Sequence, residues 1–144
     1  NLKAKRDWGF AEEYMEAIHL MLQQDKPDDF VISTGETHSV EDFTRLAFEL
    51  VGLNWKKFVR IDKKFFRPTE VSYLRGDYKK ASKKLHWKPK IKFEKLVKLM
   101  LDEDVKRWTS FLDGKKFPWD APLYPDESNL ITRLSEKKFG TRKI

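Results

Sequence analysis

The chain has 144 residues, and its 30 Lys and Arg against 23 Asp and Glu give a net charge of +7. This length fits one domain or part of a larger one, and we expect no membrane span because no apolar run approaches the roughly 18 residues required. The chain lacks cysteine, which excludes disulfides and thiolate metal sites and fits a reducing compartment.

A helix is predicted from Asp7 to Gln24, with Asp7 as its N-cap and Pro27 beyond its end. The apolar residues of this segment fall three and four positions apart, which predicts one stripe facing the core. The stripe consists of Trp8, Ala11, Met15, Ile18 and Leu22. His19 lies off the stripe, and we expect it to be solvated.

A second helix is predicted to begin at Ser39, with Asp42 three residues on as a weaker form of the capping box. It should end before Gly52, where a left-handed residue often closes a helix. Short strands are predicted at residues 30–34 and 57–61. Because two strands cannot form a stable sheet alone, these elements indicate part of an α/β protein whose main sheet lies elsewhere.

Two further helices are predicted, one from Asp77 to His86 and one from Phe93 to Leu112. In the shorter helix we expect Asp77 to cap the start and Ala81 and Leu85 to face inward. Lysines cover its other face: Lys79, Lys80, Lys83 and Lys84. Such a face can contact nucleic-acid phosphates, but a solvated lysine face is the more common case.

After Gly114 three prolines within nine residues, with aromatic residues between them, exclude a helix or a central strand. We therefore expect two parts, a domain of residues 1–113 and a Pro/aromatic-rich arm of residues 114–144.

A candidate binding turn lies at residues 65–71, which read Phe-Phe-Arg-Pro-Thr-Glu-Val. Pro68 fixes its own φ and pushes Arg67 toward an extended conformation. The planar fork of Arg67 can hold a phosphate, and Glu70 can accept hydrogen bonds from hydroxyl groups. The alternative is a solvated surface turn with an exposed ion pair.

Arg6 is a second candidate, because it precedes a predicted helix and can reach toward a ligand; the alternative is an ordinary surface charge. Both arginines, Arg6 and Arg67, lie near element ends, where binding residues concentrate. His38 can cap a helix or contact a ligand, and we favour a turn. The sequence has no Gly-rich phosphate loop, and its three histidines stand too far apart for a metal motif.

Six segments, in their order and spacing, resemble the GDP-mannose 4,6-dehydratase family. They are Arg6–Gly9, residues 21–35, His38–Val40, residues 66–71, Leu74–Asp77 and residues 84–89. The likeness covers about residues 1–104. Lys3 and Phe10 depart from the family pattern, and the arm after Gly114 has no counterpart in it.

The resemblance implies a fold class: an α/β chain that is the C-terminal substrate-binding portion of an extended short-chain dehydrogenase/reductase of the Rossmann type. This portion is mostly helical with two or more short strands. NADP and the catalytic Tyr-x-x-x-Lys belong to the N-terminal part of such enzymes, which this chain does not resemble. We therefore assign it no catalytic, cofactor-binding or metal-binding residue.

The resemblance also implies a function, as part of an NADP-dependent lyase that converts GDP-mannose to GDP-4-keto-6-deoxymannose in GDP-fucose biosynthesis. It places Arg6 and Arg67 at the GDP pyrophosphate, Glu70 at the ribose hydroxyls and Asn1 before the substrate loop. It implies a cytoplasmic homo-oligomer, a dimer or tetramer, without a nucleic-acid or membrane partner.

Two alternatives stay open. One is a stand-alone basic module that binds nucleic acid or a protein partner. The net charge of +7 and the lysine face favour this alternative. The other is a sister dehydratase or epimerase acting on another nucleotide sugar. The start of the sequence has no signal-peptide pattern. Because the first residue is Asn1 and not Met, we expect a trimmed start or a piece of a longer protein.

Overall fold

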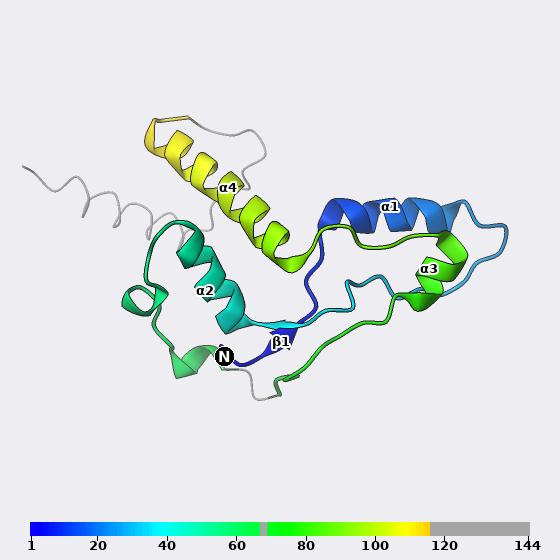
Figure 1. Ribbon diagram of the computed structural model, residues 1–144, viewed down its shortest axis with the longest axis horizontal. Helices are drawn as coiled ribbons and strands as arrows, with labels where there is room; N and C mark the ends of the chain where they lie inside the picture. Colours follow the sequence, from blue (N-terminus) through cyan, green and yellow to red (C-terminus); the bar gives the residue numbers. More distant parts are fainter. Residues whose placement is uncertain (67–68, 116–144) are drawn as a thin grey trace, which may run out of the picture. The chain divides into compact units, whose positions relative to one another are not determined.

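A computed structural model describes residues 1–66 and 69–115 of the chain. The chain divides into two compact units, residues 1–105 and residues 106–144, and the division falls within the last helix. Helices dominate (Figure 1): α1 (Ala11–Leu22), α2 (Val40–Leu50), α3 (Lys79–Leu85) and α4 (Phe93–Leu112), with 3₁₀ turns at Trp55–Lys57 and Lys63–Phe65. No helix among the described residues is both long and apolar enough to cross a membrane.

Two short strands, β1 (Lys5–Arg6) and β2 (His38–Ser39), pair antiparallel, with Arg6 opposite His38. On the other side of β1 the chain around Tyr73 runs parallel to it. Lys5 N donates to Ser72 O at 2.8 Å, and Leu74 N donates to Lys5 O at 3.1 Å. The segment after the candidate turn is thereby held against β1.

The predicted strands at residues 30–34 and 57–61 are both wrong. Within the described residues, 30–34 has no strand beside it, and the amide of Thr34 donates to a side chain, the Asp7 carboxylate. A strand needs a hydrogen-bonded neighbour, which an apolar run cannot specify. Residue 57 ends the 3₁₀ turn that starts at Trp55, and the chain just after it bonds back to the turn, since Val59 N donates to Trp55 O at 2.9 Å.

Helix α1 begins at Ala11, four residues later than predicted, and Phe10 stands at its N-cap position. Gly9 explains part of this shift, since glycine disfavours helix. Its Cα also lies so close to Tyr14 that an added Cβ would be 2.1 Å from the Tyr14 hydroxyl oxygen. Trp8 therefore lies outside the helix and stacks on Phe93, with ring centroids 5.9 Å apart.

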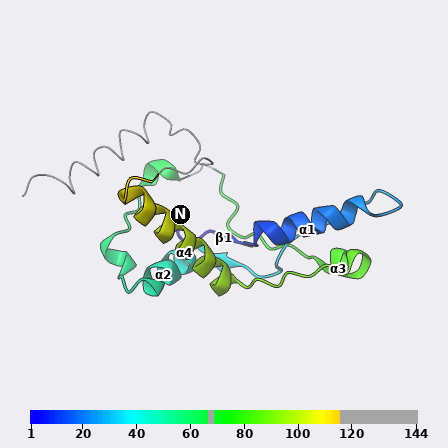
Figure 2. The same cartoon turned by 90° about the horizontal axis from the view of Figure 1, so that it is seen from above.

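Helix α1 turns a different face toward its neighbours than the predicted stripe. Met15 and Leu22 are 57% and 76% exposed, whereas Ala17 is fully buried. Ala17 packs with Ala81, Leu85 and Trp87 in the core that joins α1 to α3, and both views show these helices side by side (Figures 1 and 2). The stripe prediction is wrong within the described residues, although the inward positions predicted for α3 are confirmed. His19 is exposed, as predicted.

Glu13 is 8% exposed on the buried face of α1 because the backbone satisfies its carboxylate. Glu13 Oε1 accepts hydrogen bonds from Lys90 N at 3.0 Å and Ile91 N at 3.1 Å. The Glu13 carbonyl accepts from Trp87 Nε1 at 3.0 Å. These bonds fix the segment after α3 against α1, and they show why a charged residue takes a core position.

Helix α2 begins as the sequence predicted. Ser39 Oγ accepts from Asp42 N at 3.0 Å, and Asp42 Oδ2 accepts from Ser39 N at 3.0 Å, which completes the capping box. The hydrogen bonds of Ser39 are also the main cause that lowers the pKa of the Asp42 carboxyl. Gly52 follows the helix with a φ of +70°, which confirms the predicted left-handed stop.

The last two helices match their predictions well. Helix α3 ends at Leu85, and His86 adopts a left-handed φ of 54° at its C-cap. Asp77 does not stand at the N-cap position, which Tyr78 occupies, although its carboxylate accepts from Lys79 N at 2.9 Å. Helix α4 has the predicted bounds, with Phe93, Leu96 and Val97 buried. The predicted arm lies almost wholly outside the described residues, and the boundary at 113/114 stays a prediction.

Candidate functional site

The candidate site is built around Arg6, which lies on β1 between two neighbouring segments. On one side Arg6 pairs with His38 of β2. On the other side the bridge between Lys5 and Tyr73 holds the chain that follows the predicted turn. This bridge brings the segment that contains Glu70 and Val71 close to β1. The long side chain of Arg6 reaches back along that segment to Glu70, 64 residues away in the sequence.

The Arg6 guanidinium is fixed from three directions. Its Nη1 donates to Val71 O at 2.7 Å and to Lys5 O at 2.8 Å, and its Nη2 donates to Glu70 Oε1. About a quarter of each charged side chain remains exposed, 25% for Arg6 and 22% for Glu70. Sequence analysis identified these two residues as separate candidates, and the structure joins them in one ion pair.

Both partners keep hydrogen-bonding capacity for a ligand. Three of the five N–H donors of Arg6 are used. The others, on Nε and Nη2, have no acceptor among the described residues. Glu70 Oε2 likewise accepts no bond from the described part of the chain. A guanidinium with open donors beside a carboxylate with an open oxygen suits a ligand that carries both phosphates and hydroxyl groups.

The other two predicted site residues are not brought to this pair by any described contact. Arg67 lies outside the described residues. Asn1 is exposed, and its side-chain oxygen accepts from Lys3 N at 3.1 Å, a local turn within the first residues. The carbonyls of the same segment satisfy the start of α2, since Val40 N donates to Ala4 O at 3.1 Å.

Asp7 is the most highly connected side chain near the site, and the prediction that it caps α1 is wrong. Its Oδ1 accepts from Thr34 N at 2.8 Å and from Thr34 Oγ1 at 2.5 Å. Its Oδ2 accepts from Gly35 N at 2.9 Å and Gly76 N at 3.1 Å. One carboxylate thus joins two loops to the residue next to Arg6. Gly9 was the sequence signal that α1 starts later and leaves Asp7 free for this role.

Close packing explains the glycine at position 76 of this junction. A Cβ on Gly76 would lie 2.3 Å from the Ser33 Cβ, so no larger residue fits without movement. Arg75 Nε donates to Gly35 O at 2.7 Å and adds a second bond between the same two loops. Sequence patterns gave no sign of this contact, which joins residues 40 positions apart.

Burial and nearby carboxylates change the pKa of Tyr14, a residue of α1 whose hydroxyl lies next to Gly9. Burial is the main cause that raises the pKa of the Tyr14 hydroxyl, and the negative charges of Asp7 and Glu13 add to it. Tyr14 therefore stays neutral at physiological pH. Its ring packs edge-on against Trp87, 6.1 Å between centroids, which points to a packing role.

His38 lies opposite Arg6, but its environment is that of a packed side chain. The imidazole stacks on Phe93 with centroids 3.8 Å apart and ring planes 6° from parallel. Its Nε2 is buried and has no hydrogen-bond partner within the described residues. The described part of the chain also holds no group of three or more His, Asp and Glu side chains that could bind a metal ion.

The lysine face of α3 is partly neutralised. Asp28 accepts from Lys80 Nζ at 2.6 Å and from Lys84 Nζ at 2.7 Å. These two bonds hold the pKa of the Asp28 carboxyl far below its usual range. A helix face whose lysines already share a carboxylate is a poor platform for nucleic-acid phosphates.

Comparison with known proteins places the chain in a family. The family model described as GDP-mannose 4,6 dehydratase matches residues 1–100. GDP-mannose 4,6 dehydratase 1 of Arabidopsis thaliana is 59% identical over 106 residues, covering 74% of this chain and 29% of the relative. The Homo sapiens GDP-mannose 4,6 dehydratase is 46% identical over 123 residues, covering 74% of this chain and 33% of the relative. The chain thus spans about a third of the length of these relatives.

Solved structures show the same fold. A UDP-glucose 4-epimerase from Thermotoga maritima, crystallised with UDP-glucose, superposes with a TM-score of 0.65 at 26% identity, over 75% of this chain and 34% of that one. RMD from Pseudomonas aeruginosa, complexed with NADPH, superposes with a TM-score of 0.63 at 16% identity, over 74% of this chain and 35% of that one. The expected fold class, a portion of a Rossmann-type extended short-chain dehydrogenase/reductase, is confirmed.

Proposed function

Because the chain belongs to the GDP-mannose 4,6-dehydratase family, we propose that it forms the sugar-nucleotide-binding portion of an enzyme that converts GDP-mannose to GDP-4-keto-6-deoxymannose. The observation that carries the proposal is the ion pair of Arg6 and Glu70, which lies within the matched residues and whose remaining donors and acceptor have no partner among the described residues. Arginine forks suit the pyrophosphate of such a substrate, and a carboxylate suits ribose hydroxyls.

In this proposal the chain binds and orients the substrate. Arg6 donates its free Nε and Nη2 hydrogens to the pyrophosphate, and Glu70 accepts from a ribose hydroxyl through Oε2. The bond between Arg6 and Glu70 keeps both groups at a fixed spacing, so little side-chain entropy is lost on binding. Arg67 adds a second cation to the pyrophosphate, and Asn1 lies at the edge of the substrate loop.

The redox step belongs to a part of the enzyme outside these residues. NADP would supply hydride-transfer chemistry there. The chain has neither a glycine fingerprint nor a Tyr-x-x-x-Lys motif, so its residues do not fit NADP, and no step is assigned to them. We further propose a cytoplasmic homo-oligomer for the complete enzyme.

The test is a calorimetric titration of the protein with GDP-mannose. Arg6→Ala should weaken binding by about 1.5–3 kcal/mol, which is the scale of hydrogen bonds to a charged group. Lys5→Ala is the matched control, because it removes a neighbouring positive charge on β1 whose side chain is exposed. Equal affinities of wild type and Arg6→Ala would remove the ion pair from the binding site.

A sister enzyme acting on a different nucleotide sugar is the second candidate. The observation in its favour is the likeness to the epimerase crystallised with UDP-glucose. Titration with UDP-glucose beside GDP-mannose separates the two candidates. We expect GDP-mannose to bind more tightly, whereas a preference for UDP-glucose would support the sister enzyme.

A further inference from the structure

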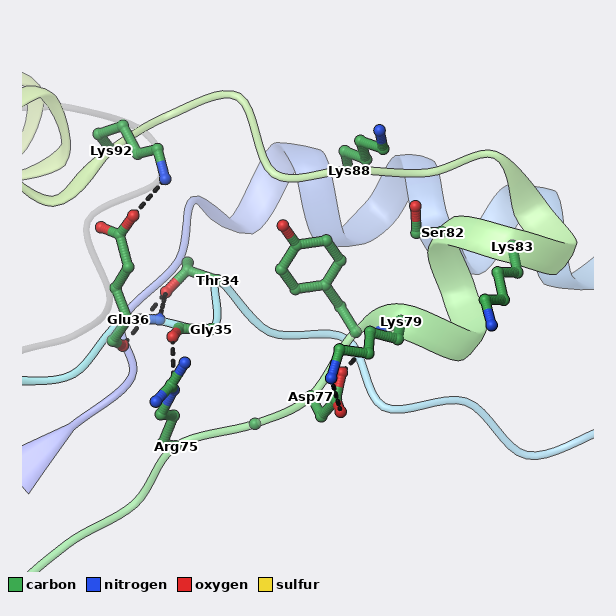
Figure 3. A pocket seen from close by; sticks show the side chains of 12 residues that line it. Thr34, Gly35, Glu36, Arg75, Asp77, Lys79, Ser82, Lys83, Lys88 and Lys92 are labelled. Carbon is green, nitrogen blue, oxygen red and sulfur yellow. Dashed lines mark hydrogen bonds and ion pairs between the residues drawn. The ribbon is translucent and has the colours of Figure 1, made fainter.

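A basic hollow lies between the loop at residues 34–36 and helix α3 (Figure 3), with a cavity volume of about 740 Å³. Five cationic residues line it: Arg75, Lys79, Lys83, Lys88 and Lys92. Its lining includes two carboxylates, those of Glu36 and Asp77. The volume is in the range of about 300–1,000 Å³ that is usual for small-molecule sites. The hollow therefore has the size of a ligand site and an excess of positive charge.

Both carboxylates in the lining are already engaged. Glu36 forms an ion pair with Lys92, as Figure 3 shows, and this bond is the main cause that raises the pKa of the Lys92 ammonium group. Asp77 lies 3.5 Å from Lys79 Nζ. Three cations, Arg75, Lys83 and Lys88, then have no carboxylate partner among the described residues. Concave sites with charges of one sign concentrate counter-ions.

Hydrogen bonds anchor the wall of the hollow where Arg75 lies. Arg75 Nε donates to Gly35 O at 2.7 Å, which anchors the guanidinium at one point, while its two Nη groups have no acceptor in the described part of the chain. The backbone N–H groups of Gly35 and of Gly76, the residue after Arg75, both donate to the Asp7 carboxylate. An anchored fork with open donors is the arrangement that recognises phosphate oxygens.

The distribution of charge on α3 favours a small ligand over a polymer. Lys80 and Lys84 lie on the same helix outside the lining, and they share the Asp28 carboxylate, which leaves one net positive charge for the pair. Among the described residues, the larger unbalanced positive charge thus lies in the hollow, at Arg75, Lys83 and Lys88. Nucleic acid needs a continuous basic surface that tracks its backbone.

We propose that this hollow binds a small anion with two or more linked phosphate groups, held by Arg75, Lys83 and Lys88. The same chemistry is present in inorganic pyrophosphate and in the diphosphate of a nucleotide. The inference does not depend on the function proposed for Arg6 and Glu70.

The experiment is a calorimetric titration of the full chain with inorganic pyrophosphate and, in a second arm, with ADP. The double variant K83Q/K88Q should lower the affinity for pyrophosphate by about tenfold, as expected for two solvent-accessible ion pairs. The matched control is K26Q/K95Q, which removes the same charge from exposed positions outside the lining. Circular dichroism of each variant verifies that the fold is kept.

Loss of affinity in K83Q/K88Q with unchanged binding in the control supports the proposal, and tighter binding of ADP than of pyrophosphate would identify a nucleotide as the source. Equal losses in both double variants, or none in K83Q/K88Q, would overturn it. If Arg6→Ala alone abolished pyrophosphate binding, the anion would occupy the Arg6 site; this inference would fail while the proposed function stood. Binding of an RNA oligonucleotide that competes with pyrophosphate and strengthens with length would also contradict it.

Discussion

Replacing Asp7 by Asn should destabilise the protein more than any other single charge removal near the site. The Asp7 carboxylate accepts four hydrogen bonds, two on each oxygen. An Asn at this position keeps only one acceptor oxygen. If that oxygen stays at Thr34, the amide nitrogen faces the backbone N–H donors of Gly35 and Gly76, which then lose their acceptor. Each unsatisfied, partly buried donor costs about 1–3 kcal/mol.

Because the two losses share one site and are not additive, we expect Asp7→Asn to lower the free energy of unfolding by about 2–4 kcal/mol. At this chain length each kcal/mol corresponds to roughly 2–4 °C in Tm. Urea denaturation followed by circular dichroism measures the change. Hydrogen exchange should also accelerate at the amides of Gly35 and Gly76, which lose their acceptor.

The matched control is Asp25→Asn, which removes the same charge from an exposed carboxylate and should change stability by less than about 0.5 kcal/mol. If Asp7→Asn were as stable as the control, with unchanged exchange at both glycines, the carboxylate would not hold the two loops together. The account of how the site is positioned would then be wrong.

Three further predictions concern local features. Ser39→Ala should lower the free energy of unfolding by about 1 kcal/mol through loss of the capping box, and an unchanged urea midpoint would contradict this. The pKa of Asp28 is depressed, so its contribution to stability is present above its unfolded pKa and disappears as the pH falls through the folded value. An NMR titration of its carboxyl should show an upward shift in K80Q/K84Q, and an unchanged value would exclude these lysines as the cause. His86→Gly should raise Tm because glycine tolerates the left-handed φ; a lower Tm would indicate that the imidazole stabilises the helix end.

Elements set by local chemistry could be predicted from the sequence. The bounds of α4 follow from five turns of regular apolar spacing, and the start of α2 follows from Ser39 and Asp42, which are three residues apart. The left-handed stop at Gly52 is equally local. In each case the interactions that decide the structure lie within one or two helical turns.

Elements that depend on distant partners could not be predicted in this way. Asp7 fits an N-cap locally, but it bonds to Gly35 and Gly76, which are 28 and 69 residues away. Residues 30–34 have the composition of a strand, yet no described segment pairs with them. The exposed stripe of α1 has the right period for a core face, and period alone does not say which segment covers it.

The candidate site shows the same division. Local chemistry identified Arg6 and Glu70 as separate candidates, but neither composition nor spacing relates them across 64 residues, and only the family resemblance assigned both to one ligand. The bridge at Tyr73 brings the two segments together, and the length of the Arg6 side chain lets it reach Glu70. The hollow at Arg75 had no sequence signal beyond a surplus of lysine, because its charge balance depends on which lysines find a carboxylate.

The most direct test of the central claim asks whether Glu70 contacts the ribose hydroxyls of a bound GDP group. The dissociation constants of GDP and of 2′,3′-dideoxy-GDP are measured for wild type and for Glu70→Gln, which together form a thermodynamic cycle. We expect the wild type to bind the dideoxy compound about tenfold more weakly than GDP, as for loss of one charged hydrogen bond, and Glu70→Gln to bind the two almost equally. The same ratio in both proteins would contradict the placement of the ribose at Glu70, and with it the proposed orientation of the substrate.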